Sequence, residues 1–274
     1  MSLQCKAVIS HGNRDGTCSV ENIQVNEPEA DEVLVKIKAS GLCHTDYDSL
    51  TWGSPLVMGH EGAGVIVSTG SDITEFSIGD RVMLNWATPC GVCNRCAEGS
   101  LHLCAKNSPV IAGDNGYTPG HAHPYGTLWK EKPITRAFNL GTLSEYALVK
   151  SSAVVPLDNA QISYEAACII GCAVITGYGS VMRTANIEPG SSAAVLGCGS
   201  VGLNVIQACR IAGADPIIAI DISDNKLKMA SYLGATHTIR SYRGETSMQQ
   251  VNHEIYAGTD LHGTEYAFEC TAVP

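Results

Sequence analysis

The segment from residue 193 to 239 constrains the fold most, because strand-like and helix-like runs alternate along it. Apolar strands at 193–196 and 217–220 flank a helical run at 201–213, and a further helix and strand follow. This β-α-β-α-β order is typical of a parallel sheet with helices packed on its faces. The run TEYAFEC at 264–270 has the pattern of a fourth strand, so we predict a doubly wound α/β domain here.

A glycine-rich turn lies between the first strand and the first helix of this segment. Gly197, Gly199 and Gly202 form G-x-G-x-x-G, which permits a tight turn, close approach of a pyrophosphate and close helix–sheet packing. The amino terminus of the following helix attracts phosphate groups. Asp221 ends the next strand, where a carboxylate binds ribose hydroxyls and repels a 2′-phosphate. The motif predicts NAD as cofactor, and a glycine-rich turn without a ligand is the alternative.

The N-terminal part of the chain has a different texture. Short β-like runs at 32–40, 62–70, 80–86 and 144–150 are separated by Gly, Pro, Asp and Ser, which predicts a β-barrel or sandwich-like domain. Residues 105–140 are rich in Gly, Pro and His and show little periodicity, so we expect a long irregular surface loop there.

The composition is that of a globular chain and bears on its partners. Of 274 residues, 45% are apolar and 16% are charged, the formal net charge is −10, and no Lys/Arg-rich run occurs. These features argue against binding to nucleic acid or an anionic membrane. The start lacks a signal-peptide pattern and no apolar run reaches about 18 residues, so we expect a cytoplasmic protein. In a reducing compartment, the twelve cysteines are expected in cores or on metals rather than in disulfides.

Four of these cysteines form a cluster with the spacing C-x2-C-x2-C-x7-C, namely Cys90, Cys93, Cys96 and Cys104. Four thiolates at such spacing can surround Zn²⁺ completely, which leaves no open position for chemistry and predicts a structural site. An iron–sulfur cluster is the competing interpretation, but the run lacks the closing C-P pair of bacterial ferredoxins. Unligated core cysteines are the ordinary alternative.

The strand at 32–40 runs into the sequence GLCHTD at 41–46, which either turns a corner or places reactive side chains at one point. The motifs GHEGAG at 59–64, GDRV at 79–82 and GCAVITGYG at 171–179 accompany it. Together with the cysteine cluster and the glycine-rich turn, these motifs resemble the zinc-dependent medium-chain alcohol dehydrogenases, class III-like members in particular. The resemblance extends over the whole chain.

The resemblance implies that Cys43, His60 and Cys172 bind a catalytic zinc ion. Two thiolates and one imidazole leave one tetrahedral position open, as a catalytic site requires. A surface histidine and a buried core cysteine are the ordinary alternatives for these residues. Glu61 is implied beside the metal, opposite the substrate, and Asp46 is expected to orient the imidazole of His60.

The same resemblance implies roles in the reversible, NAD-dependent oxidation of a primary alcohol to an aldehyde. Thr45 is expected to take the alcohol proton and pass it to the nicotinamide ribose. Asp48 stands where many relatives have a histidine that ends the proton relay, and a carboxylate with a pKa of about 4 is a poor base at neutral pH. The other implied cofactor contacts are His44 at the pyrophosphate, Thr176 and Val201 at the nicotinamide, and Lys226 at the adenosine ribose.

Two positions bear on the substrate. Relatives that oxidise the glutathione adduct of formaldehyde carry an arginine shortly after the last cysteine of the cluster; Ser108 aligns with it here, and Lys106 is the cation that could replace it. Trp86 is expected to line the substrate pocket and, with Thr45, to narrow it. We therefore expect an ordinary primary alcohol or aldehyde, aromatic ones included, and keep S-(hydroxymethyl)glutathione as the alternative.

The implied domains are a GroES-like β-barrel at 1–157, with the four-cysteine lobe at 90–104, and an NAD-binding Rossmann domain at 158–274. A six-stranded dinucleotide domain has two more strand–helix units after the strand at 264–270, on the order of 60 residues. We therefore expect an incomplete Rossmann domain in a fragment of a protein that forms homo-oligomers at full length. An inactive zinc-binding remnant stays open as a second hypothesis. A structural module built on the lobe is a third, but it leaves the glycine-rich turn unexplained.

Overall fold

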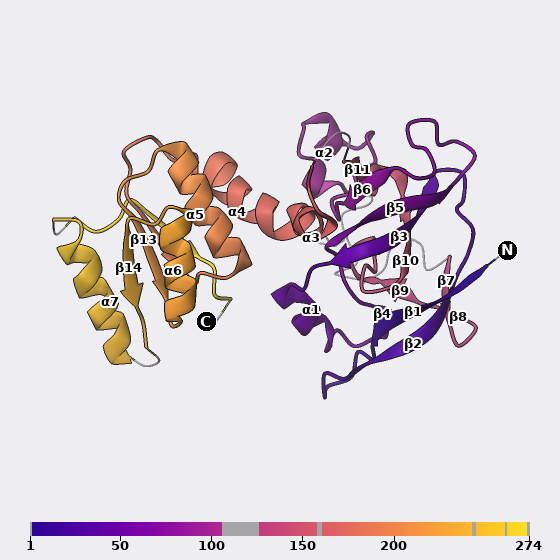
Figure 1. Ribbon diagram of the computed structural model, residues 1–274, viewed down its shortest axis with the longest axis horizontal. Coiled ribbons are helices and arrows are strands. Elements are labelled where there is room, and N and C mark those ends of the chain that lie inside the picture. Colours follow the sequence, from indigo (N-terminus) through magenta and orange to yellow (C-terminus); the bar gives the residue numbers. More distant parts are fainter. Residues whose placement is uncertain (1, 106–125, 158–160, 243–244, 261, 273–274) are drawn as a thin grey trace. The chain divides into compact units, whose positions relative to one another are not determined.

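The computed structural model describes residues 2–105, 126–157, 161–242, 245–260 and 262–272. The chain forms two compact units, Met1–Cys172 and Ala173–Pro274 (Figure 1). The domain boundary predicted between residues 157 and 158 adjoins residues 158–160, which lie outside the described part of the chain, and it stays a prediction.

The first unit contains an antiparallel sheet of five strands in the order β10-β3-β5-β6-β11. Its strands are β3 (Glu32–Ser40), β5 (Gly62–Thr69), β6 (Arg81–Leu84), β10 (Tyr146–Lys150) and β11 (Val154–Pro156), with the short helix η3 (Ser151–Ala153) before β11. Alternate residues such as Val33 and Val35, or Val82 and Leu84, point into one apolar cluster, as the two-residue period of a strand requires. The four strands predicted from the sequence in this unit are confirmed.

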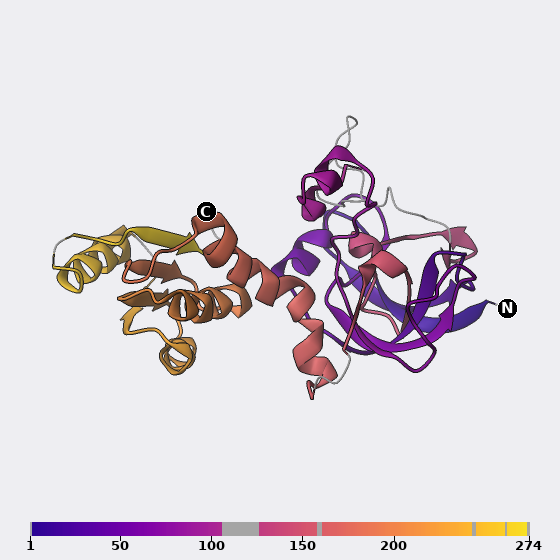
Figure 2. The ribbon, with the colours of Figure 1, turned by 90° about the horizontal axis from the view of Figure 1, so that it is seen from above.

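A second sheet in this unit has six strands in the order β8-β7-β2-β1-β4-β9. Its strands are β1 (Leu3–Ser10), β2 (Cys18–Val25), β4 (Leu56–Val57), β7 (Thr127–Trp129), β8 (Lys132–Pro133) and β9 (Thr135–Arg136). Leu34 of β3 and Leu148 of β10 pack with Ile9 and Ile23 of this sheet, so the two sheets share a core. The predicted barrel-like domain results, and its curled strands are visible in Figures 1 and 2.

The surface loop predicted over 105–140 is wrong for its last third. Residues 127–136 supply β7, β8 and β9, and Ile134 and Leu140 are buried, with the helix η2 (Ala137–Asn139) just before Leu140. Strands of two or three residues are too short to show a hydrophobic period, so the sequence gives no sign of them. Residues 106–125 of this prediction lie outside the described residues.

The second unit is built on a parallel sheet of four strands in the order β14-β13-β12-β15. The strands are β12 (Ala193–Leu196), β13 (Ile217–Asp221), β14 (His237–Arg240) and β15 (Tyr266–Glu269). Numbered along the chain, their order is 3-2-1-4, as in the first four strands of the dinucleotide-binding fold. The predicted α/β arrangement is confirmed.

Three helices cover this sheet: α5 (Ser200–Ala212), α6 (Asp224–Leu233) and α7 (Glu245–Ala257). Helices α5 and α6 pack on the face that presents Val195 and Ala219, and α7 packs on the face that presents Ile218 and Ile220 (Figure 2). Because successive residues of a strand point to opposite faces, the unbroken apolar runs AAVL and IIAI supply both faces at once.

A helical run joins the two units along the chain. It comprises α3 (Tyr164–Cys168), η4 (Ile170–Val174), α4 (Ile175–Gly179) and η5 (Ser180–Ala185), of which η4 and η5 are π-helical. With a mean hydropathy of 1.5, the run Tyr164–Ala185 is long and apolar enough to span a membrane, a property that core helices of soluble proteins share. Ala167 and Cys168 belong to an apolar cluster of the first unit and Val181 to the core of the second, so we interpret it as a core helix.

The packing of α5 makes a testable prediction, because Ile206 is 0% exposed and Ile211 is 67% exposed on the same helix. We expect Ile206→Ala to lower the free energy of unfolding by about 2–5 kcal/mol, since it removes buried methyl groups and leaves a cavity. The matched variant Ile211→Ala should change it by less than about 0.5 kcal/mol. Urea unfolding followed by circular dichroism measures both, and equal losses would contradict the assignment of the buried face.

Candidate active site

Four side chains from three separate segments of the sequence converge in the first unit. Cys43, His60, Glu61 and Cys172 each offer a donor atom, and these atoms all lie within 4.8 Å of one another. Cys43 caps the amino end of α1 (His44–Ser49), His60 and Glu61 precede β5, and Cys172 lies in η4. His60 and Glu61 are buried, and the two cysteines are half-buried. The structure thus brings together the residues that the sequence motifs suggested for one metal.

The carboxylate of Asp46 holds two of these residues in place. It is 3% exposed, and its Oδ2 accepts a hydrogen bond from the backbone N–H of Cys43 at 3.0 Å. Its Oδ1 lies 3.1 Å from Nδ1 of His60. A carboxylate only accepts hydrogen bonds, so Nδ1 is the nitrogen that donates to Asp46, and Nε2 is the nitrogen that can bind a metal once it is deprotonated. That nitrogen lies 3.5 Å from Sγ of Cys172, on the side where a metal would bind.

The neighbouring groups shift the pKa values of all four side chains in this cluster. The hydrogen bond with Cys172 lowers the pKa of Cys43 to about 3 against the opposing effect of burial, and the same bond, with burial, raises the pKa of Cys172. Burial lowers the pKa of His60, but hydrogen bonds with Asp46 and Cys43 outweigh it and raise the pKa to about 9. Burial also raises the pKa of Glu61. One negative charge is therefore shared by two adjacent thiols, which a bound cation would stabilise in full.

This donor set fits zinc. Ligands 2.0–2.3 Å from a tetrahedral zinc ion lie roughly 3.3–3.8 Å apart, and the 3.5 Å between Cys172 Sγ and His60 Nε2 falls in that range. Two thiolates and one imidazole are a ligand set of catalytic zinc, with one position left for substrate. The hydrogen bond from Asp46 to the far nitrogen of the imidazole is also typical of zinc-binding histidines.

An irregular helix places Cys172 in the cluster. The π-helical turn of η4 interrupts the regular α-helical phase, and such turns occur frequently at functional sites. Gly171 lies against β6, where an added Cβ would come within 2.1 Å of the carbonyl oxygen of Leu84. Only glycine permits this approach, which lets Cys172 reach His60 from a position 112 residues further along the chain.

The four-cysteine cluster forms a lobe around α2 (Asn94–Ala97) and η1 (Leu101–Leu103). The four sulfur atoms lie within 4.8 Å of one another; Sγ of Cys93 is 3.5 Å from that of Cys96 and 4.0 Å from that of Cys104. Backbone hydrogen bonds from Cys96 and Ala105 lower the pKa of Cys93 to about 6, whereas burial raises the pKa of Cys96 to about 11. The spacing fits a tetrahedral all-thiolate zinc site.

The glycine-rich turn lies in the second unit, between β12 and α5, with Gly199 as the cap of α5. Asp221 ends β13, is buried, and accepts hydrogen bonds from the backbone N–H groups of Cys198 at 2.7 Å and Ser223 at 2.8 Å. Lys226 Nζ lies 3.9 Å from Asp221 Oδ2. The carboxylate therefore ties the turn after β12 to the turn after β13, at the edge where this fold binds dinucleotides.

Two family comparisons agree with this arrangement. Residues 29–159 match the alcohol dehydrogenase GroES-like domain, and residues 200–274 match the zinc-binding dehydrogenase domain. The chain is also 35% identical over 274 residues to S-(hydroxymethyl)glutathione dehydrogenase from Saccharomyces cerevisiae, an alignment that covers 98% of this chain and 69% of the relative. The chain belongs to the zinc-dependent medium-chain alcohol dehydrogenase family. Its zinc and NAD(H) dependence as a family member follows from these matches.

Solved structures show the same fold for this alcohol dehydrogenase. An alcohol dehydrogenase zinc-binding domain protein from Burkholderia ambifaria superposes with a TM-score of 0.81 at 31% identity, covering 100% of this chain and 72% of the other. Benzyl alcohol dehydrogenase from Acinetobacter calcoaceticus gives a TM-score of 0.81 at 28% identity, covering 99% and 72%. The predicted fold class, a GroES-like barrel followed by a Rossmann sheet, is confirmed.

A group of aromatic side chains borders the candidate metal ligands of this alcohol dehydrogenase. The ring of Phe138 lies 4.7 Å from that of His60, 5.7 Å from Trp86 and 6.0 Å from Trp52, measured between centroids. The sequence suggested Trp86 but missed Trp52 and Phe138. Phe138 has a left-handed backbone, with φ 51°, which is rare for a bulky residue and recurs at functional sites. The sequence around Phe138 carries no signal that would have predicted this conformation.

The remaining predicted site residues that the structure describes lie on three helices, α1, α4 and α5. Thr45 is half-buried on α1 with Oγ1 3.6 Å from Cys43 Sγ, beside the cluster. His44 and Asp48 lie one turn apart on the same helix, 58% exposed each, with Nε2 and Oδ1 3.7 Å apart. In the second unit, Thr176 lies on α4, which packs against α5, the helix that carries Val201. Ser108 and Lys106 lie outside the described residues.

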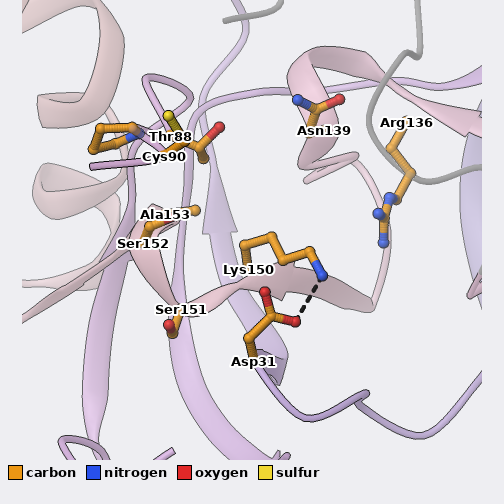
Figure 3. A pocket seen from close by; sticks show the side chains of 10 residues that line it. Asp31, Thr88, Cys90, Arg136, Asn139, Lys150, Ser151, Ser152 and Ala153 are labelled. Carbon is orange, nitrogen blue, oxygen red and sulfur yellow. Dashed lines mark hydrogen bonds and ion pairs between the residues drawn. The ribbon is translucent and has the colours of Figure 1, made fainter. Parts of the chain in front are cut away.

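A separate cavity of about 390 Å³ lies beside the lobe (Figure 3). Cys90 lines it, but the four donors around Cys43 do not. Its two cations have internal partners: Lys150 Nζ lies 2.7 Å from Asp31, and Nη1 of Arg136 donates to the carbonyl of Leu148. We therefore assign no catalytic role to this cavity.

The glycine-rich turn makes a prediction that separates packing from binding. A Cβ at Gly202 would lie 1.8 Å from the carbonyl oxygen of Gly197, so Gly202→Ala should lower the free energy of unfolding by about 1–3 kcal/mol. A Cβ at Gly199 meets no atom within 4 Å, so Gly199→Ala should change it by less than about 0.5 kcal/mol. Gly199→Ala should still weaken ADP-ribose binding about tenfold, because the added methyl group obstructs the pyrophosphate. Thermal unfolding and titration calorimetry measure the two effects, and equal destabilisation by both variants would contradict this account.

Proposed function

We propose that this alcohol dehydrogenase reversibly oxidises a primary alcohol to an aldehyde with NAD, using one catalytic and one structural zinc ion. The convergence of Cys43, His60 and Cys172, with donor atoms at tetrahedral spacing, carries the proposal. The buried partner Asp46 supports it, because it fixes the imidazole tautomer that a metal ligand needs.

These three residues would hold the catalytic zinc, with the carboxylate of Glu61 within reach of the same point. Zinc bound there supplies a Lewis acid that lowers the pKa of an alcohol hydroxyl. The structural zinc would be held by Cys90, Cys93, Cys96 and Cys104.

The protein's own groups handle the proton. Thr45 Oγ1, beside Cys43, would accept the proton of the substrate hydroxyl. It would donate its own hydroxyl proton onward along a hydrogen-bonded path. His44, adjacent to Thr45, and Asp48, one turn further along α1, are both exposed, so we propose that this pair ends the path at bulk water. Asp46 lies outside this path, since its two oxygens are hydrogen-bonded to Cys43 and His60.

NAD would bind at the carboxyl edge of the parallel sheet and supply the hydride acceptor. The backbone at Gly197, Gly199 and Gly202 would hold the pyrophosphate, and Asp221 the ribose hydroxyls, with Lys226 nearby. We keep His44 as a pyrophosphate contact and Thr176 and Val201 as nicotinamide contacts. All twelve cysteines are free thiols, which supports action in the reducing cytoplasm.

The substrate we favour is an aromatic primary alcohol. Phe138 lies against His60, and Trp52 and Trp86 lie against Phe138; these rings offer faces and edges that pack well against another aromatic ring. The resemblance to benzyl alcohol dehydrogenase supports this choice. S-(hydroxymethyl)glutathione is the second candidate, supported by the yeast relative at 35% identity.

Zinc content tests the ligand assignment. We expect two zinc ions per wild-type chain by inductively coupled plasma mass spectrometry. Cys43→Ser should lose one zinc ion together with turnover, because a serine hydroxyl is a much weaker ligand than a thiolate. Cys96→Ser should lose the other zinc ion. Cys18 is exposed and lies outside both clusters, so Cys18→Ser is the matched control and should retain both. Two zinc ions retained by Cys43→Ser would refute the catalytic site, and one zinc ion without turnover in the wild type would favour an inactive remnant.

The aromatic group is tested by comparing substrates. Phe138→Ala should lower kcat/KM for benzyl alcohol about tenfold, the loss of roughly 1.4 kcal/mol of ring contact, and change that for ethanol less than about threefold. Phe138→Leu keeps apolar volume without the ring and should give an intermediate loss. Parallel losses for both alcohols would rule out a substrate-specific role. Turnover of S-(hydroxymethyl)glutathione well above that of benzyl alcohol would favour the second candidate.

A further inference from the structure

A cluster of charged side chains surrounds Asp221 at the carboxyl edge of the parallel sheet. Asp221 and Arg240 are direct partners in the register of β13 and β14. Side chains at paired positions of neighbouring strands point to the same face, so Arg240 lies beside the carboxylate proposed to bind the ribose. Lys226 Nζ also lies 3.9 Å from Oδ2 of Asp221. Two cations thus border one carboxylate.

Arg240 is engaged by a second carboxylate. Asp224, the first residue of α6, has Oδ1 2.5 Å from Nη1 of Arg240. The guanidinium also lies over the ring of Tyr242, 5.5 Å from its centroid. The hydrogen bond between Asp224 and Arg240 lowers the pKa of the carboxyl group and raises that of the guanidinium, so both carry their charge at neutral pH. Nε of Arg240 is buried without a hydrogen-bond partner among the described residues.

The charge balance at this edge depends on Asp224. Asp221 and Asp224 contribute two negative charges, and Lys226 and Arg240 two positive ones, so the four groups sum to zero. Without Asp224 the sum would be positive, and the guanidinium would be released. NADP differs from NAD only by a 2′-phosphate on the ribose that Asp221 is proposed to bind, and arginine is well suited to bind phosphate with two parallel hydrogen bonds.

We propose that Asp224 is a specificity residue, which keeps NADP out by holding Arg240 away from the 2′-phosphate position. The inference rests on the dinucleotide site of the proposed function. It assigns the discrimination to two carboxylates: Asp221 repels the phosphate directly, and Asp224 sequesters the arginine that would otherwise attract it.

The test compares two ligands by titration calorimetry on the whole chain: ADP-ribose and ADP-ribose 2′-phosphate. For the wild type we expect ADP-ribose to bind more tightly. Asp224→Asn should shift the ratio of the two dissociation constants about tenfold toward the phosphorylated ligand, the effect of one charge-assisted hydrogen bond gained. Adding Arg240→Gln to Asp224→Asn should abolish the shift.

Two controls separate this role from a structural one. Asp224→Glu keeps a carboxylate at the start of α6 and should keep the ratio near that of the wild type. Glu188→Gln removes one negative charge from an exposed position in the loop before β12, and it should leave the ratio unchanged. If Glu188→Gln changed the ratio of dissociation constants as much as Asp224→Asn, the effect would come from net charge alone, and the proposal would be overturned.

The outcomes distinguish the two proposals. If the wild type binds ADP-ribose and Asp224→Asn leaves the ratio unchanged, only the role of Asp224 is overturned. A shift that survives Arg240→Gln overturns it as well, because the arginine is then not the group released. If the wild type binds neither ligand, the result contradicts the dinucleotide site of the proposed function, and the role of Asp224 is overturned with it.

Discussion

A single buried carboxylate, Asp46, fixes the geometry on which the candidate catalytic centre depends. It binds the backbone N–H of Cys43 with one oxygen and Nδ1 of His60 with the other, so the end of β3 is joined to the start of β5 by side-chain contacts. Removing one partner of such a buried charged pair costs about 3–5 kcal/mol, since the remaining charge is left without compensation. The same bonds decide which nitrogen of His60 faces Cys172. The hydrogen bonds of Asp46 therefore contribute both to the stability of the barrel and to the orientation of the candidate metal ligands.

The two cysteine-containing clusters differ in how they are assembled. The lobe takes all four thiols from fifteen consecutive residues, so short helices and turns bring them together. The candidate catalytic cluster draws on three separated segments, and it needs the two sheets, the π-helical turn at Cys172 and the glycine contact with β6 to be in place first. A local cluster can stabilise a surface lobe, whereas the distant one couples metal affinity to the folding of the whole first unit.

The second unit shows how one carboxylate serves both fold and ligand. Asp221 accepts two backbone hydrogen bonds, which hold the turns after β12 and β13, while its charge remains available at the edge of the sheet. Its neighbours Lys226, Arg240 and Asp224 set the net charge that an incoming dinucleotide meets. Under our proposal, selectivity for the cofactor is a property of these four charged side chains together.

The sequence by itself determined the β-α-β segment, the glycine-rich turn with Asp221, and the four-cysteine lobe, because each depends on residues close together in the chain. Resemblance of short motifs also pointed to Cys43, His60 and Cys172, and the structure brings them within donor distance. Only the tertiary structure decided that Phe138 stands beside His60 with Trp52 packed against it, and that Arg240 lies next to Asp221. Periodicity and motifs encode local conformation, whereas these contacts arise from strand register and from the left-handed backbone at Phe138, which no spacing along the chain reveals.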